Sequence, residues 1–361
     1  MLPDAVENTV GNSEVTWEKV RKQNYGIDLK MFGARLSLTA DYFFEHRYDI
    51  LSTRNTLPSI VAIELPLINL GEVDNRGYEI SLGWNSRTEK IDWWVQGNVS
   101  YSKNKIIFMD EVMPNYPWMA QTGRSTGLNY GYRFDRFLRA DDFDADGALK
   151  SDGEGKPLLP VMSLGSPRPG DALFKDLNGD GKIDGNDKTY FGYSQRPDYV
   201  LGLLGGFRYK NFEISMQWTA GLHASRMLSG EYRNAFGSTN GRALLKFLAD
   251  GRWTPENPDA RFPRLTFLNK SHYLEDSDLW LMDGSYLRLK VAEIGYTFRD
   301  IPAFRKVGVK SLKVYFSGYN LLTLFSDLND IDIDPEGATS GSNIDSYPNV
   351  RIFNFGVNIT F

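Results

Sequence analysis

The sequence predicts an all-β fold, an antiparallel β-barrel that spans a membrane. Three observations point to this fold. Segments of about ten residues alternate apolar and polar side chains, short and long connections alternate between these segments, and aromatic residues gather at two heights of the predicted wall. Aromatic residues are also frequent, at 14% of the chain, which suits strands better than helices.

Composition excludes several other classes of protein. The 41 basic and 46 acidic residues give a net charge of −5 without a polybasic segment, so we expect no binding to nucleic acid. The chain contains no cysteine, which excludes thiolate metal sites, catalytic thiols and disulfides. No apolar run reaches about 18 residues, so a membrane protein built from helices is excluded as well.

The alternation traces nine strands along the chain. The first covers Val20–Phe32, and Gly33 permits a tight turn into the second. The phase of the seventh strand changes near Val291, where apolar positions pass from odd to even numbers, and this predicts a β-bulge. After the first strand, the others are expected at 36–45, 77–84, 93–101, 199–208, 212–218, 287–298, 312–316 and 350–361.

The connections between these strands alternate in length. Short ones lie at Gly33, 85–90, 209–211 and 299–310, and long ones lie at 50–70, 102–198, 219–280 and 323–348. Outer-membrane barrels show this asymmetry, with short periplasmic turns and long extracellular loops. If the C-terminus is periplasmic, the first and last of the nine strands both descend through the membrane. Because bacterial single-chain barrels have even strand numbers, we expect further strands to precede these.

Aromatic residues mark two girdles on the apolar face, as expected at the two interfaces of a membrane. The periplasmic girdle would contain Trp84, Trp93, Phe212, Tyr296, Phe298 and Phe361. The outer girdle would contain Tyr25, Tyr42, Phe44, Tyr78, Tyr101 and Trp218. The last strand carries Phe353, Phe355, Val357 and Ile359 on the same face and ends at Phe361, an ending that resembles the C-terminal signal of bacterial outer-membrane proteins.

One loop motif has the spacing of a calcium site. In the stretch 176–187, oxygen-bearing side chains occupy positions 1, 3, 5, 9 and 12 of the calcium-loop template, with a glycine at position 6. Position 7 would contribute a backbone carbonyl. The predicted Ca²⁺ ligands are therefore Asp176, Asn178, Asp180, Lys182, Asp184 and Asp187. An ion-free loop of Asx turns is the alternative reading. A second acidic run, 142–153, has Lys150 at position 9 and is read as a solvated turn.

No pattern of catalytic residues stands out. The three histidines, His46, His223 and His272, are far apart in the sequence and form no readable triad. Four loop aromatics could stack on sugar rings or pack the loops against one another, and these are Tyr116, Trp118, Trp253 and Trp280. We therefore predict that the protein is not an enzyme.

Several segments together resemble the SusC-type TonB-dependent outer-membrane transporters of Bacteroidetes. The resemblance runs in order along nearly the whole chain, through Glu14–Glu18, Tyr25–Asp28, Leu36–Phe44, Gly71–Ile80, Pro169–Asp171, the loop at 176–187, Gly284–Lys290, Ile294–Tyr296, Tyr319–Thr323 and Phe355–Phe361. It implies that residues 1–361 supply about nine strands of a 22-stranded transmembrane barrel that is closed by a plug. The plug, the TonB contact and the early strands would then belong to preceding sequence, because residues 1–13 lack the features of an export signal.

The resemblance also implies partners and a location. The protein would lie in the outer-membrane lipid, draw energy from the TonB complex, and import glycans or peptides captured with a SusD-type surface lipoprotein. The alternative from another class is a secreted β-rich glycan-binding module stabilised by Ca²⁺, in which the apolar faces pack against each other. The two readings differ in whether the apolar faces are covered by protein or exposed to lipid.

Overall fold

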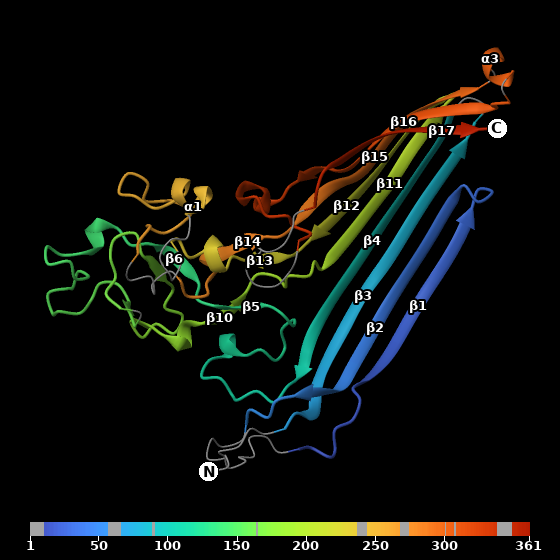
Figure 1. Ribbon diagram of the computed structural model, residues 1–361. Coiled ribbons are helices and arrows are strands. Elements are labelled where there is room, and N and C mark those ends of the chain that lie inside the picture. Colours follow the sequence, from blue (N-terminus) through green and yellow to red (C-terminus); the bar gives the residue numbers. More distant parts are fainter. Residues whose placement is uncertain are drawn as a thin grey trace, which may run out of the picture.

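In the computed structural model, nine long strands form one antiparallel sheet in which every strand pairs with its neighbours in chain order (Figure 1). The residues described are 11–56, 66–88, 91–163, 165–236, 244–267, 274–299, 301–306, 308–337 and 349–361. The strands are β1 (Lys19–Met31), β2 (Leu36–Ser52), β3 (Ile68–Arg87), β4 (Ile91–Phe108), β11 (Tyr199–Tyr209), β12 (Phe212–Leu222), β15 (Tyr286–Arg299), β16 (Ser311–Leu324) and β17 (Ile352–Thr360). The nine-strand prediction is confirmed.

Five strands, β2, β3, β4, β12 and β16, extend further toward the long loops than their apolar pattern predicted. Strand β2 continues to Ser52 and pairs there with Ile68 of β3, so parts of the expected loop 50–70 are strand. Strand β4 likewise reaches Phe108, inside the range 102–198 expected to be loop. In β3 and β4 the extensions carry charged residues such as Arg76 and Lys103 on the outward face, because strand pairing beyond the membrane does not require an apolar face. Their alternation therefore gave no signal in the sequence.

The predicted bulge is present in β15. The register of β15 shifts between Leu289 and Val291 against β16, and β12 shows the matching shift between Gln217 and Trp218. Lys290 is the extra residue against β12, whereas against β16 the extra residue lies on β16, where 320 and 321 oppose Lys290. The bulge brings Leu287 and Leu289 onto the same outward face as Ile294 and leaves Arg288 on the inner face, opposite Thr323.

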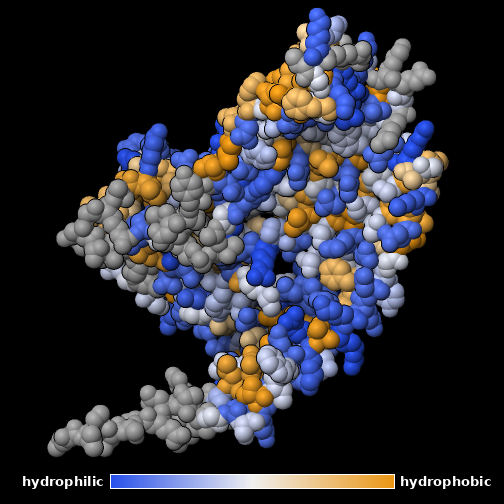
Figure 2. Space-filling model, turned by 45° about the vertical axis from the view of Figure 1, so that its right-hand side comes forward, coloured by the Kyte–Doolittle hydropathy of each residue, from blue (hydrophilic) through white to orange (hydrophobic). Residues whose placement is uncertain are grey.

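The outward face of the sheet is apolar and uncovered. Phe355 is 73% exposed, and exposed apolar side chains lie along every one of the nine strands, as a lipid-facing wall requires. Hydrophilic residues dominate the middle of the face shown in Figure 2. None of the described helices is long and apolar enough to cross a membrane. The apolar faces therefore do not pack against a second layer, which argues against the secreted module.

Tyrosines align across five neighbouring strands. Tyr25, Tyr42, Tyr78, Tyr101 and Tyr199 are successive cross-strand partners, so their side chains share the outward face. The rings of Tyr101 and Tyr199 lie 4.6 Å apart, and those of Tyr78 and Tyr101 lie 5.4 Å apart. At the opposite end, the indole rings of Trp84 and Trp93 stack at 6.4 Å. Both aromatic girdles are confirmed at these positions.

The long loops contain the smaller elements of the fold. Short ladders pair β5 (Asn129–Gly131) with β10 (Thr189–Phe191), β6 (Phe134–Phe137) with β8 (Ala172–Phe174), β7 (Val161–Met162) with β9 (Lys182–Ile183), and β13 (Ser225–Met227) with β14 (Leu281–Asp283). The helices among the described residues are α1 (Lys246–Asp250) and α3 (Pro302–Arg305), and 3₁₀ turns occupy Pro117–Met119, Ala140–Asp142, Gly185–Asp187, Gly230–Tyr232, Asp278–Trp280 and Asp327–Ile331. Helix α3 lies at the end with the short turns, whereas α1 lies among the long loops (Figure 1).

Candidate functional site

The loops at the outer ends of the strands fold into a layer with its own hydrophobic core. We call the described residues of 109–198, 223–285 and 325–337 the loop layer. Its fully buried side chains include Leu138, Phe174, Ile183, Leu248, Trp280 and Leu328. In Figure 1 these segments lie together beside the sheet, at the end away from α3. The main buried core of the described chain is therefore outside the predicted membrane region.

A buried ion pair joins two distant parts of the loop layer. Asp171 is fully buried, and its Oδ1 accepts a hydrogen bond of 2.7 Å from Nε of Arg264. Its other oxygen accepts a hydrogen bond from the backbone N–H of Arg168. The preceding Gly170 has φ of +87°, and a Cβ there would lie 2.5 Å from the ring of Trp253. Only glycine fits this position, which explains the Pro-Gly-Asp sequence at 169–171.

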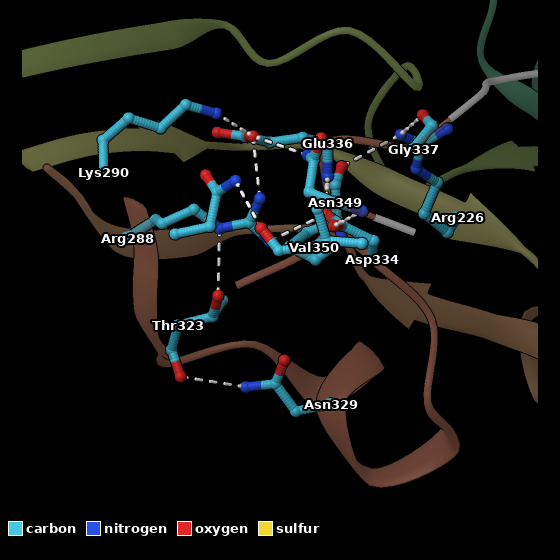
Figure 3. Close-up of polar contacts among 12 residues, drawn as sticks. Arg226, Arg288, Lys290, Thr323, Asn329, Asp334, Glu336, Gly337, Asn349 and Val350 are labelled. Carbon is cyan, nitrogen blue, oxygen red and sulfur yellow. Dashed lines mark hydrogen bonds and ion pairs between the residues drawn. The ribbon is translucent and has the colours of Figure 1, made fainter. Parts of the chain in front are cut away.

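A second ion network ties the last loop to the inner face of the sheet (Figure 3). Arg288 of β15 contacts Asp334 at 2.7 Å and Glu336 at 2.8 Å, and Lys290 contacts Glu336 at 2.5 Å. The side chain of Arg288 is 4% exposed and that of Asp334 is 8% exposed. Arg226 of β13 adds hydrogen bonds to two backbone carbonyls at 335 and 337. The network thus connects the sheet to two segments of the loop layer, β13 and 334–337.

The network is electrostatically matched. Burial by itself would raise the pKa of Asp334, but hydrogen bonds from Arg288 and from two backbone N–H groups outweigh it, so the pKa lies below its ordinary value. Burial lowers the pKa of Arg226. Arg288 and Lys290 both donate to the same carboxylate, Glu336. The carboxylate of Asp334 is therefore held charged beside the buried guanidinium of Arg288.

The structure places the predicted calcium residues in a compact turn whose carboxylates bind backbone N–H groups. Asp176 accepts from Gly179 and Gly181, and the buried Asp187 accepts from Leu177 and Asp184. Three other motif side chains each accept a hydrogen bond from the backbone N–H two residues further along the chain, and these are Asn178, Asp180 and Asp184. Lys182 lies in β9. Within the described residues, no three His, Cys, Asp or Glu side chains are grouped closely enough to hold a metal.

The second acidic run forms Asx turns of the same kind. Asp144 accepts hydrogen bonds from the backbone of residues 146 and 148, and Asp152 accepts from residues 154 and 156. Asp142 instead pairs with both guanidinium nitrogens of Arg136 at 2.7 and 2.8 Å. This pairing with Arg136 holds the pKa of Asp142 below its ordinary value, even though burial opposes it.

The loop aromatics take packing positions. Trp280 is 1% exposed and Trp253 is 8% exposed, so neither offers a face to a sugar. Tyr116 and Trp118 stack at 4.5 Å, and the Nε1 of Trp118 donates to the carbonyl of Asn186. These two rings therefore support the loop that contains the calcium motif.

The histidines lie in separate places. His46 of β2 contacts Asp74 at 2.8 Å, and His223 lies 3.8 Å from Asp198 and stacks on Tyr193. His272 lies outside the described residues.

The profile of the family described as "TonB dependent receptor-like, beta-barrel" matches residues 2–321 of this chain. The chain belongs to this family. Among curated relatives, this TonB-dependent receptor is 30% identical to TonB-dependent receptor P3 of Formosa agariphila over 97% of the chain and 35% of that relative. It is 24% identical to TonB-dependent receptor SusC of Bacteroides thetaiotaomicron, over 97% of the chain and 32% of SusC.

Solved structures confirm the fold of this TonB-dependent receptor. The RagAB peptide importer in its open-open state superposes with a TM-score of 0.69 at 20% identity, over 98% of the chain and 36% of the importer chain. The receptor spans about a third of the length of the curated relatives it matches. It is an outer-membrane protein, and its nine strands are part of an antiparallel transmembrane barrel wall.

Sequence reasoning missed the residues that organise the loop layer. In the sequence, Arg288 is a charged residue within a largely apolar strand. This was the signal that could have identified it, because a buried arginine in a strand rarely lacks charged partners. Its partners Asp334 and Glu336 lie 46 and 48 residues further on, in an acidic loop with many equivalent carboxylates. No local spacing distinguishes those two from their neighbours.

Proposed function

We propose that this receptor forms the outer mouth and part of the wall of an active importer for glycans or peptides. Its loop layer is packed around a core and tied to the inner face of the sheet through Arg288, which supports a fixed mouth over the lumen. Loops without this core and this contact to the sheet would not form a fixed opening over the lumen. In this proposal the protein moves its substrate without cleaving it, so it is not an enzyme.

The proposed partner at the mouth is a SusD-type surface lipoprotein. The loop layer exposes large apolar side chains that a protein partner could cover, from three different loops. Met113 is 90% exposed, Phe267 is 72% exposed and Phe325 is 82% exposed. Contiguous apolar patches on a surface mark interaction sites, and in this proposal these three side chains contribute to such a patch. The other proposed partner, the TonB complex, would act through sequence that precedes these strands in the longer relatives.

Uptake by cells tests the proposed transport. The full-length receptor and its neighbouring lipoprotein gene are expressed together, and cells are supplied with fluorescent oligosaccharides or oligopeptides. We expect accumulation of one class, lost when TonB is deleted and lost again in a Met113→Ser, Phe325→Ser variant that no longer copurifies the lipoprotein. Uptake that persists without TonB would indicate passive diffusion and contradict active import.

We also propose that Ca²⁺ binds the loop at 176–187. The residue types support it, because Asp176, Asn178, Asp180 and Asp184 supply hard oxygen ligands from one short stretch, and Ca²⁺ takes about six to eight of these. Each carboxylate that accepts a backbone N–H keeps further lone pairs for a cation. The ion would rigidify the loop that Tyr116 and Trp118 support.

Replacing the acids tests the calcium proposal. In the variant Asp176→Asn, Asp180→Asn, Asp184→Asn, we expect backbone amides of 174–191 to exchange faster with solvent than in the wild type when Ca²⁺ is present. The membrane strands should keep their protection, because their ladders and lipid contacts do not involve this loop. Asp144→Asn with Asp152→Asn is the matched control. Equal exchange of the wild type in chelator and in calcium would contradict the proposal.

A further inference from the structure

The outward face of the sheet changes from apolar to charged immediately beyond the aligned tyrosines. Along β3, the outward residues Leu82, Ile80 and Tyr78 are followed by Arg76 and Asp74. Along β4, Tyr101 is followed by Lys103 and Lys105. The register between these strands is regular from 73 to 87, so all of these side chains share one face. Tyrosine rings prefer the membrane interface, so the cations lie at headgroup level.

Arg76 and Lys103 form an unusual pair. They are direct cross-strand partners, and their neighbours in the same row are Phe44 and Gln23, which carry no charge. Like charges opposite each other in a sheet are destabilising. Among the described residues, neither Arg76 nor Lys103 makes an ion pair or a side-chain hydrogen bond to the protein. Within the part of the chain that the structure describes, the pair therefore has no carboxylate in direct contact with it.

A cavity of about 490 Å³ opens beside this pair. Segments of the loop layer, including 123–125 and 192–194, form its far wall, and Phe44 adds an apolar surface. Four basic residues, Arg76, Lys103, Lys105 and Arg124, and two acids, Asp74 and Asp198, line this space. Both acids already have a histidine neighbour, since Asp74 contacts His46 and Asp198 lies near His223. The cavity thus has a surplus of positive charge.

We propose that this cavity binds the phosphate of a phosphorylated lipid headgroup in the outer leaflet. A phosphate between Arg76 and Lys103 would accept charge-assisted hydrogen bonds from both and remove their mutual repulsion. Acyl chains of the same lipid would pass the half-buried Tyr78 and Tyr101 and lie along the exposed Ile80 and Leu82 below them. A free phosphate would satisfy the two cations but would gain nothing from this apolar wall. The site faces away from the lumen, so it is separate from the proposed transport path.

Lipid binding to the full-length receptor in detergent tests this site. The probe is lipid A that carries its phosphates, titrated by native mass spectrometry against wild type and against Arg76→Gln, Lys103→Gln. We expect about a tenfold weaker affinity in the variant, because two charge-assisted contacts are lost. Lipid A treated with phosphatase should bind the wild type as weakly. The control Lys30→Gln, Arg35→Gln removes the same charge at the other end of the strands and should bind like wild type.

Two results would overturn the assignment. One is equal lipid A affinity in wild type and in the Arg76, Lys103 variant. The other is inorganic phosphate that displaces lipid A at matched concentration, since the ligand would then be a free anion. Thermal stability gives an independent readout, because lipid A should reverse the sign of the difference in melting temperature between the variant and the wild type. Without lipid the variant should melt no lower than wild type, because a repulsion is removed, and with lipid A the wild type should melt higher.

Discussion

Residues 1–361 expressed on their own will not form a closed, conducting barrel. Strands β1 and β17 are the two edges of the sheet, and eight successive antiparallel pairings make them run in the same direction. Closure would require a parallel pair in an otherwise antiparallel wall. Left open, the edges expose backbone N–H and C=O groups of Lys19–Met31 and Ile352–Thr360 to lipid. Each such group costs several kcal/mol at membrane depth, so insertion as a monomer is prohibited.

Introduced cysteines make this result measurable, since the chain has none of its own. Ile27→Cys with Phe355→Cys probes contact between the two edges after refolding into lipid vesicles. Phe316→Cys with Phe355→Cys is the positive control, because these residues are direct cross-strand partners. We expect a disulfide only in the control and no steps of membrane conductance. A disulfide between the edges, or stable conductance, would mean that the sheet closes on itself.

Replacing Arg288 by alanine is expected to release the last loop from the inner face of the sheet. The substitution leaves Asp334 and Glu336 buried without their main partner, and an uncompensated buried charge costs about 3–5 kcal/mol. Amides of 325–337 should therefore exchange with solvent at least about a hundredfold faster than in the full-length wild type. Hydrogen exchange of the receptor in lipid nanodiscs measures this directly.

Lys313→Ala is the matched control for Arg288. Lys313 pairs with Glu293 at 2.8 Å on the neighbouring strands, but its side chain is 25% exposed, so its loss should cost about 1 kcal/mol or less. A further variant, Arg288→Met with Asp334→Asn and Glu336→Gln, should recover much of the lost protection, because it leaves no buried charge unpaired. Equal exchange of 325–337 in Arg288→Ala and Lys313→Ala would show that the network does not hold the loop.

The strands of the membrane wall were predictable because the alternating pattern that marks each strand lies within a short stretch of sequence. A lipid-facing strand must alternate, so the nine strands, their order, the bulge near Val291 and both girdles follow from residues within a few positions of one another. Strand ends were less predictable. Beyond the membrane the outward face no longer needs to be apolar, and the extensions to Ser52 and Phe108 therefore carry no pattern.

The loop layer was not predictable for the opposite reason. Its contacts join residues far apart in the sequence, such as Asp171 with Arg264 and Arg288 with Asp334. The folded loops bring these partners together from among many similar charged residues. No repeating pattern in the sequence marks which residues pair. The Pro-Gly-Asp sequence at 169–171 belongs to the segments that resemble the family, but its physical cause, the close approach of Gly170 to Trp253, exists only in the folded structure.

The buried core in the loops has a consequence for how the receptor melts. The wall is stabilised by lipid contacts and strand pairing. The loop layer lies in water and is stabilised by the burial of side chains such as Phe174 and Trp280 away from that water. Only the second kind of burial carries a large heat capacity of unfolding per residue. Calorimetry should therefore resolve two transitions, and urea should lower the temperature of the loop transition while changes of detergent shift that of the wall.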